Sequence, residues 1–148
     1  MIYKSTKTFG HQLGLSVAFR QWRAQSHCRF LHGYALAVRF EFESEQLDER
    51  HWVVDFGDMK DLLKILESYF DHKTLVAADD PELDWFKAAH QKGILELVIV
   101  PATSCEKFAE LIFKRTVQWL QDKQLAPRCR LSSVEVREHG ANSAIYSA

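Results

Sequence analysis

A thiol and an imidazole lie four residues apart in the segment Cys28-Arg29-Phe30-Leu31-His32-Gly33-Tyr34. Basic side chains surround the cysteine in sequence, and positive charge nearby favours the reactive thiolate form. A thiolate at this place could act as a base or as a nucleophile. A cysteine without catalytic partners is more often a small buried apolar residue. The segment therefore makes Cys28 a candidate catalytic residue, with simple packing as the alternative.

Asp71 and His72 form a second candidate site, directly after a segment with helical periodicity. An aspartate that orients a neighbouring histidine can make it a general acid or base near neutral pH. The alternative is structural, because a histidine at the C-terminus of a helix interacts favourably with the helix dipole.

Glu138 ends a row of apolar residues, since the alternation of a strand puts it on the same face as Val134 and Val136. A carboxylate in that position must find a partner or remain solvated at the end of the sheet. The sharper hypothesis is a ring with a 2-amino-4-oxo pattern, because one carboxylate can accept two parallel N–H bonds.

Hydrophobic periodicity predicts an α+β fold, an antiparallel four-stranded sheet with two long helices on one face. Residues 34–43 show the clearest strand, with Tyr34, Leu36, Val38, Phe40 and Phe42 facing one way. Residues 79–93 are polar and compatible with a helix. The predicted long helices are 59–69 and 105–123, and the other predicted strands are the pair 2–9 and 13–20, then 95–100, 130–138 and 143–147.

Length and composition indicate one domain, residues 1–148, because domains cluster near roughly 100–150 residues. The three cysteines are widely spaced and odd in number, which favours a reducing, cytoplasmic setting over a disulfide framework. Neither an apolar run long enough for a membrane nor a secretory signal is visible. The formal net charge of −1 gives no indication of nucleic-acid binding.

Basic residues precede the first acidic residue of the chain, Glu41. Such a distribution can arise by chance on solvated strands. It also fits a basic rim that binds a polyanionic ligand such as a triphosphate through charge-assisted hydrogen bonds. The residues are Lys4, Lys7, Arg20, Arg23, Arg29 and Arg39.

Four separated segments resemble motifs of the 6-pyruvoyltetrahydropterin synthase family, which includes the 6-carboxytetrahydropterin synthases. The first candidate segment resembles the motif Cys-x-x-x-His-Gly-His of the 6-carboxy enzymes, with Tyr34 in place of the second histidine. The others are Phe70-Asp71-His72-Lys73-Thr74-Leu75 for Leu-Asp-His-x-x-Leu, Ser104 and Glu106 for Pro-Thr-x-Glu, and Glu138 with Tyr146 for Glu-x7-Tyr.

The resemblance implies a fold and an assembly. It implies the tunnelling fold, in which subunits join their sheet edges into a barrel and active sites lie between subunits. A trimer-based homo-oligomer, commonly a hexamer, is expected on the same ground. The family substrate is 7,8-dihydroneopterin triphosphate, from which the carboxy-type enzymes remove triphosphate and cleave the side chain, in queuosine biosynthesis.

Site roles follow from the same resemblance. Cys28 would be the base that moves side-chain protons, and His72, oriented by Asp71, would transfer the complementary proton. Glu138 would anchor the pterin ring. Residues 103–106 also form a capping box in which Thr103 caps a helix and Glu106 returns the bond, so this segment is expected to be mainly structural. Ser104 and Glu106 are candidate substrate contacts, whereas Cys105 and Cys129 are expected to pack in the core.

The chain departs from the family at the zinc site. Three histidines would bind zinc, but Phe19 and Tyr34 occupy two of those positions and only His32 remains. A catalytic zinc needs three protein donors, so zinc is expected to be absent or weakly bound. Three explanations remain open: a site rebuilt by His11, His27 or His139, an acid/base role for the Tyr34 hydroxyl, or lost catalysis with retained ring binding.

Three functions are therefore considered. The first is a pterin lyase resembling 6-carboxytetrahydropterin synthase, and the second a non-catalytic module that binds a pterin or purine-like ring. The third is an unrelated α+β protein in which Cys28, His72 and Glu138 lie far apart.

Overall fold

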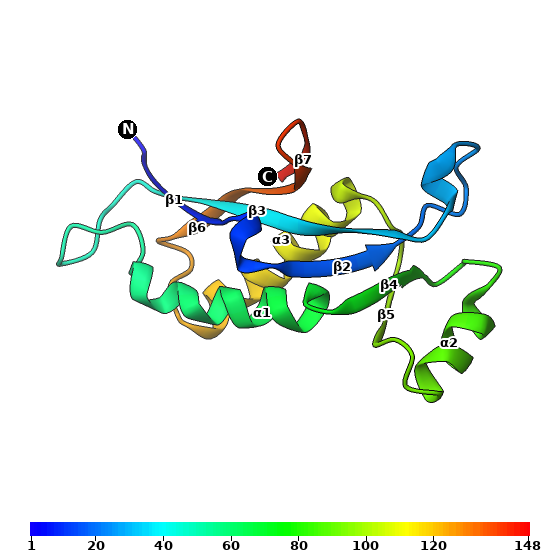
Figure 1. Ribbon diagram of the computed structural model, residues 1–148. Helices are drawn as coiled ribbons and strands as arrows, with labels where there is room; N and C mark the ends of the chain where they lie inside the picture. Colours follow the sequence, from blue (N-terminus) through cyan, green and yellow to red (C-terminus); the bar gives the residue numbers. More distant parts are fainter.

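Seven strands form one mixed sheet in the computed structural model, which describes residues 1–148 (Figure 1). The strand order across the sheet is β5-β4-β2-β3-β6-β7, and β1 also pairs with β3. The strands are β1 (Tyr3–Phe9), β2 (Leu15–Phe19), β3 (His32–Ser44), β4 (Lys73–Ala77), β5 (Leu97–Val100), β6 (Arg130–His139) and β7 (Asn142–Ser147).

The long strand β3 is the centre of the sheet. Its alternating apolar residues Leu36, Val38, Phe40 and Phe42 are fully buried, which confirms the face predicted for them. The strands β1 and β2 do not pair with each other, so the expected pairing of 2–9 with 13–20 is wrong. Both instead pair antiparallel with β3, one after the other along the same edge, because β3 is long enough to take both.

The sheet is larger than the four antiparallel strands predicted. Strands β1, β3, β6 and β7 do form antiparallel pairs, but β4 lies parallel to β2 and β5 lies parallel to β4. A parallel pair requires a crossover connection, which helices supply here. Strand β4 directly follows Asp71-His72. It was not predicted, because it is a short buried run without the alternation that marks a half-exposed strand.

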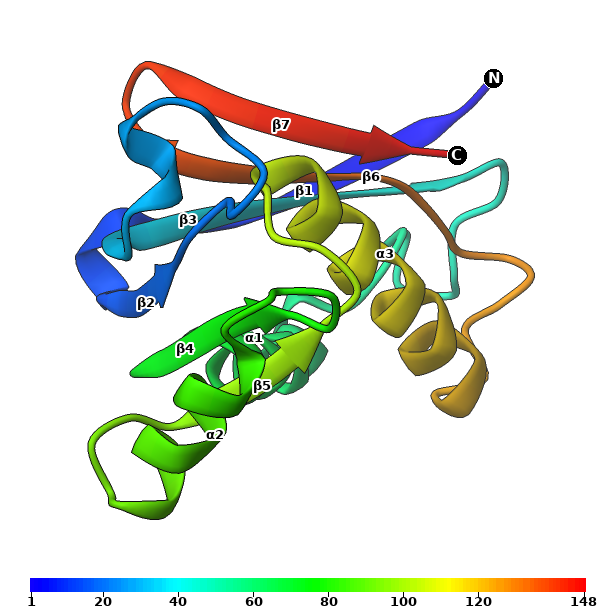
Figure 2. The same cartoon turned by 90° about the vertical axis from the view of Figure 1, so that its right-hand side faces the viewer.

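Two long helices, α1 (Lys60–Phe70) and α3 (Cys105–Asp122), cover one face of the sheet, as predicted (Figure 2). Phe108 joins the layers, since its ring lies edge-on to that of Phe19 at 5.0 Å and packs against that of Phe70 at 5.7 Å between centroids. A shorter helix, α2 (Leu83–Gln91), lies within the segment expected to tolerate a helix and connects β4 to β5.

One cluster of 29 buried hydrophobic residues fills the space around these layers. The three cysteines are all free thiols, and Cys105 and Cys129 are buried. Every helix is too short or too polar to cross a membrane.

Candidate functional site

A cleft of about 320 Å³ opens where β2, β3, β6 and the start of α3 meet. Five of the predicted site residues, Cys28, His32, Ser104, Glu106 and Glu138, line it together, although they come from three separate parts of the chain. Its lining consists of Phe19, Gln21, Ala24, Ser26, Cys28, His32, Tyr34, Thr103, Ser104, Cys105, Glu106 and Glu138. The cleft therefore contains two thiols, a phenol, an imidazole and two carboxylates.

The strand register explains the sequence His32-Gly33-Tyr34. Phe19 lies opposite His32, and because side chains alternate along a strand, Tyr34 faces the same side as His32. Gly33 lies between them, and a Cβ atom added to it would come within 2.5 Å of the carbonyl oxygen of Val17. Only glycine allows β2 and β3 to approach this closely, so Gly33 is required for the cleft to form.

The loop that carries Cys28 is held by backbone hydrogen bonds. The N–H of Gln21 donates to the carbonyl of Cys28 at 3.0 Å, and the Ser26 hydroxyl accepts the N–H of Cys28 at 3.4 Å. The side chain of Gln21 also donates to the carbonyl of Thr103 at 2.9 Å, which ties this loop to the segment before α3. The thiol is therefore presented to the cleft by an ordered turn.

Ser104, and not Thr103, caps α3. The Ser104 hydroxyl accepts the N–H of Lys107 at 3.1 Å, so the predicted capping role of Thr103 is wrong. Thr103 is buried, and its hydroxyl donates to the carbonyl of Arg20 at 2.6 Å. The hydrogen bond to Arg20 therefore engages the Thr103 hydroxyl, which the local sequence pattern would assign to the helix cap. The Ser104 hydroxyl proton remains able to donate to a ligand.

An ion pair fixes the other end of the Cys28 loop. The guanidinium of Arg20 donates to both carboxylate oxygens of Asp80, at 2.6 and 2.9 Å. The Asp80 side chain is 1% exposed. Burial by itself raises the pKa of Asp80, but hydrogen bonds from Arg20 and from the N–H of Glu82 outweigh it and hold that pKa below its usual value.

We expect Asp80→Ala to lower the free energy of unfolding by about 3 kcal/mol, because it leaves the partly buried Arg20 without its partner. Since the folded-state pKa of Asp80 is lowered, its contribution is present above the unfolded value and is lost as the pH falls through the folded one. The difference between wild type and variant should therefore shrink below about pH 4. Urea unfolding at several pH values measures it.

Asp79→Ala is the matched control, because Asp79 pairs with Arg23 on the exposed surface and its loss should change stability little. An Asp80→Ala variant as stable as Asp79→Ala at pH 7 would contradict the anchoring role.

Most of the predicted basic rim is neutralised by pairing. Arg20 and Arg23 pair with Asp80 and Asp79, and Lys4 and Arg39 both pair with Glu41. Arg29 forms no ion pair, and its guanidinium lies over the ring of Phe30 at 4.4 Å. Arg29 follows Cys28 in sequence, but its side chain lines a different hollow, together with Phe30 and Trp85.

Glu138 has a partner that the sequence did not predict. Its oxygen Oε1 accepts the thiol proton of Cys105 at 3.6 Å. Burial and the charge of Glu138 raise the pKa of Cys105 to about 12, so this thiol is protonated at neutral pH. Burial and the same carboxylate also raise the pKa of Tyr34. Cys105 was expected to be a packing residue, and its place between Ser104 and Glu106 is the signal that could have identified it.

The three zinc-ligand positions of the family form an aromatic cluster. The rings of Phe19, His32 and Tyr34 lie 5.4 to 6.0 Å apart between centroids. Phenylalanine offers no donor, and the raised pKa of Tyr34 keeps its phenol protonated. No group of three histidine, cysteine or carboxylate side chains is arranged to hold a metal. These residues do not fit a zinc site.

The other histidines do not rebuild that site. His11 bonds to the carbonyl of Ala35 and borders a different hollow, and neither His27 nor His139 lines the cleft. The ring of His139 does lie 6.2 Å from that of Tyr34, but no group of three possible ligands forms there, so the geometry shows no relocated zinc site.

Asp71 and His72 lie together but outside the cleft. Nδ1 of His72 is 2.7 Å from Oδ1 of Asp71, which leaves Nε2 free, and the His72 side chain is 84% exposed. His72 also has a positive φ of 58°, a conformation uncommon for residues other than glycine. The predicted pairing of these two residues is present, on the surface of the protomer.

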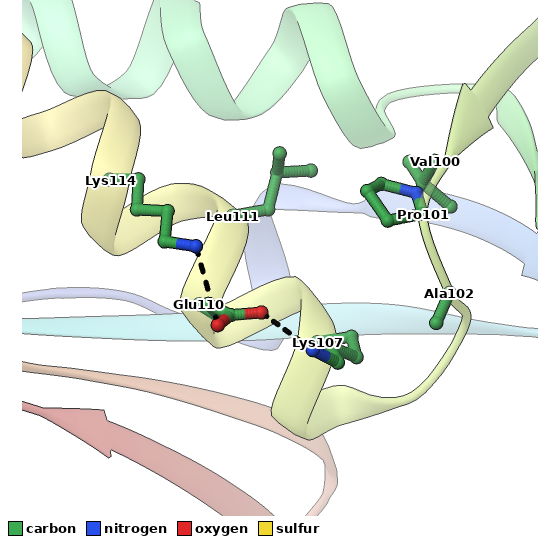
Figure 3. A pocket seen from close by; sticks show the side chains of 7 residues that line it. All are labelled: Val100, Pro101, Ala102, Lys107, Glu110, Leu111 and Lys114. Atoms are coloured by element: carbon green, nitrogen blue, oxygen red, sulfur yellow. Dashed lines mark hydrogen bonds and ion pairs between the residues drawn. The ribbon is translucent and has the colours of Figure 1, made fainter.

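A second hollow on α3 offers less chemistry. It holds about 80 Å³ and is lined by Val100, Pro101, Ala102, Lys107, Glu110, Leu111 and Lys114 (Figure 3). Glu110 bonds to both Lys107 and Lys114, so its charged groups satisfy one another. With neither thiol nor imidazole, this hollow is no rival to the cleft.

Comparison with known proteins identifies the family to which the chain belongs. Residues 10–148 match the family described as 6-pyruvoyl tetrahydropterin synthase. The chain belongs to this family. A 6-carboxy-5,6,7,8-tetrahydropterin synthase of Aquifex aeolicus is 24% identical over 149 residues, which cover 98% of this chain and 88% of that protein.

A 6-carboxy-5,6,7,8-tetrahydropterin synthase of Rickettsia conorii is 35% identical over 60 residues. That match covers 40% of this chain and 44% of the Rickettsia protein, so it spans less than half of either.

Solved structures show the same fold. An uncharacterized protein from Wolinella succinogenes superposes with a TM-score of 0.83 at 20% identity, covering 99% of this chain and 98% of that one. The 6-pyruvoyl tetrahydropterin synthase of Plasmodium falciparum gives a TM-score of 0.73 at 15% identity, with the same coverage. The family fold thus extends over the whole chain, including the strands β4 and β5 that the sequence did not predict in this arrangement.

Proposed function

We propose that this protein is a pterin-pathway lyase resembling 6-carboxytetrahydropterin synthase, and that it acts on 7,8-dihydroneopterin triphosphate or a related pterin. The observation that carries the proposal is the meeting of Cys28 and Glu138 in one cleft. In the proposed reaction the thiol moves a proton and the carboxylate recognises the ring, and one cleft supplies both groups.

The cleft suits a 2-amino-4-oxo ring at its Glu138 end. A carboxylate can accept two parallel N–H bonds from such a ring. The phenol of Tyr34 lies close enough to Glu138 for the charge of that carboxylate to raise the pKa of Tyr34. Ser104 and Glu106 line the same cleft and can bond to other ring atoms. Glu138 therefore orients the ring, and the side chain of the substrate extends toward Cys28.

Cys28 acts in this proposal as the base that removes a proton from the substrate side chain. The complementary proton comes from His72 of a neighbouring copy, held in position by Asp71. The exposed, preformed dyad supports this arrangement, because His72 presents its free nitrogen to the surface and not to its own cleft. The active protein in this proposal is accordingly a homo-oligomer built from trimers, such as a hexamer of two trimers.

An activity assay tests the proposed function. Incubation of the purified protein with 7,8-dihydroneopterin triphosphate should release triphosphate and form a 6-carboxytetrahydropterin, both separable by chromatography. Ring binding that requires Glu138 but gives no product would instead favour the non-catalytic binding module. If the protein neither binds the pterin nor forms a product, both the lyase and the binding module are refuted.

We also propose that the reaction here does not depend on zinc, because the ring cluster of Phe19, His32 and Tyr34 supplies a single good metal donor. Protein expressed in zinc-supplemented medium should hold well below one zinc per chain by elemental analysis. Turnover should survive incubation with a strong chelator. One tightly held zinc per chain would overturn this proposal.

The double variant Phe19→His/Tyr34→His is the matched positive control. It places three imidazoles where ring centroids already lie 5.4 to 6.0 Å apart, within reach of one metal ion. This variant should bind close to one zinc per chain. That result would show that Phe19 and Tyr34 are the reason why the wild-type protein binds little zinc.

A further inference from the structure

The second thiol of the cleft is placed against the carboxylate that is proposed to bind the ring. Cys105 is the first residue of α3 and is 7% exposed. Its Sγ lies 3.6 Å from Oε1 of Glu138, a hydrogen bond between residues 33 positions apart in sequence. The contact therefore joins the start of α3 to the end of β6, across the floor of the cleft.

Cys129 shows what a purely structural cysteine looks like in this protein. It is fully buried, and burial raises its pKa to about 11, but no carboxylate contributes to that shift. Cys129 also lines none of the hollows around the cleft. Burial is therefore common to both thiols, whereas the bond to a ligand-facing carboxylate is specific to Cys105.

A carboxylate at the end of a strand needs such a contact if it is to bind a planar ring. Free rotation of the Glu138 side chain would cost entropy on binding, because a rotamer-rich side chain loses freedom when it is immobilised. A donor that bonds to one oxygen in the empty cleft fixes the plane of the carboxylate in advance. Each carboxylate oxygen has two lone-pair sites, so Oε1 can accept from Cys105 and from the ring together.

We propose that Cys105 is a positioning residue whose S–H bond to Glu138 orients that carboxylate for a 2-amino-4-oxo ring. The inference rests on the proposed function and deepens it, since it assigns ring recognition to a Cys105–Glu138 pair and not to Glu138 alone. Cys105 does not touch the reacting atoms, so it acts on ring affinity and not on the chemical step.

Binding of neopterin, a fluorescent 2-amino-4-oxo pteridine, tests the inference. Cys105→Ala should raise the dissociation constant by about fivefold, because it removes the hydrogen bond from the weak S–H donor to the Glu138 carboxylate. Cys105→Ser keeps a donor in the same place and should stay within about twofold of wild type. In turnover assays Cys105→Ala should raise KM and leave kcat unchanged, whereas a general packing defect would lower kcat and would also affect Cys105→Ser.

A chemical test is independent of the pterin. The rate of alkylation by iodoacetamide at pH 8.5, followed by peptide mass spectrometry, reports the thiolate fraction of each cysteine. Glu138→Gln removes the negative charge next to Cys105 and keeps the size of the side chain at position 138. The pKa of Cys105 should fall, so its thiol should react several-fold faster. Cys129 in the same sample is the internal reference and should react at an unchanged rate.

The two tests separate the inference from the proposed function. If wild type fails to bind neopterin but alkylation of Cys105 responds to Glu138→Gln, the pair is real and the ring assignment fails. If neopterin binds equally well to wild type and Cys105→Ala, the positioning role is overturned. If the alkylation rate of Cys105 is the same in wild type and Glu138→Gln, the contact between Cys105 and Glu138 is overturned.

Discussion

Cys28→Ala should lower the turnover of 7,8-dihydroneopterin triphosphate by about a thousandfold, the range expected when a positioned acid/base group is lost. The thiol lines the cleft on a turn that backbone hydrogen bonds hold in place. The second thiol of the cleft cannot replace it, because Cys105 is protonated near neutral pH, and Glu138 is proposed to bind the ring. Product formation under saturating substrate measures the loss.

Binding of neopterin should be almost unchanged in Cys28→Ala, because the ring contacts lie at the Glu138 end of the cleft. Cys129→Ala is the control for removal of a thiol in general, and its kcat should match that of wild type, since Cys129 lies in the core. A Cys28→Ala protein with more than a tenth of wild-type kcat would show that another group moves the proton.

The strong periodic elements of the fold were predictable because each carries its signal within one segment. Strand β3 alternates over its whole length, and α3 keeps helical spacing from Cys105 onward. Strand β5 lies within the predicted strand 95–100, whereas β4 carries no such pattern, since a short buried run in a parallel sheet has no polar face. Their place depends on tertiary contacts, and so does the separation of β1 from β2, which share the edge of β3 instead of forming a hairpin.

Most of the cleft could be predicted because the motif residues are short-range neighbours on well-defined elements. His32 and Tyr34 share a strand face, and Ser104 and Glu106 share the first turn of a helix. The Cys105–Glu138 bond joins residues 33 positions apart, and no local pattern encodes it. Thr103 shows the opposite case, because a strong local capping signal yields to a hydrogen bond with Arg20.

The position of the Asp71–His72 dyad follows from the parallel pairing of β4 with β2. The N–H of His72 donates to the carbonyl of Ser16 at 2.7 Å. Phe19, at the edge of the cleft, lies three residues further along β2, about 10 Å away at the usual rise of a strand. Together with the exposure of the His72 ring, this separation favours a dyad that serves another protomer.

Mixed oligomers of Cys28→Ala and His72→Ala should therefore regain activity that neither variant has alone. In a random one-to-one mixture, half of the clefts contain Cys28 and half of the neighbouring dyads contain His72, so about one quarter of the wild-type activity is expected if each site is shared by two subunits. Chains that are co-expressed with one common tag, so that all assemblies are recovered, provide this random mixture. The initial rate per chain is the measurement.

The same mixture gives no activity if each protomer uses its own dyad, because no single chain then carries both residues. Co-expression of Cys28→Ala with Cys28→Ser is the matched control, since that hybrid lacks the thiol in every cleft and should stay inactive under either arrangement. A regained quarter would also establish that the active protein is an oligomer. A hybrid as inactive as its parents would show that His72 acts within its own chain or not at all, and the dyad would then be explained by the favourable charge of a histidine at the end of α1.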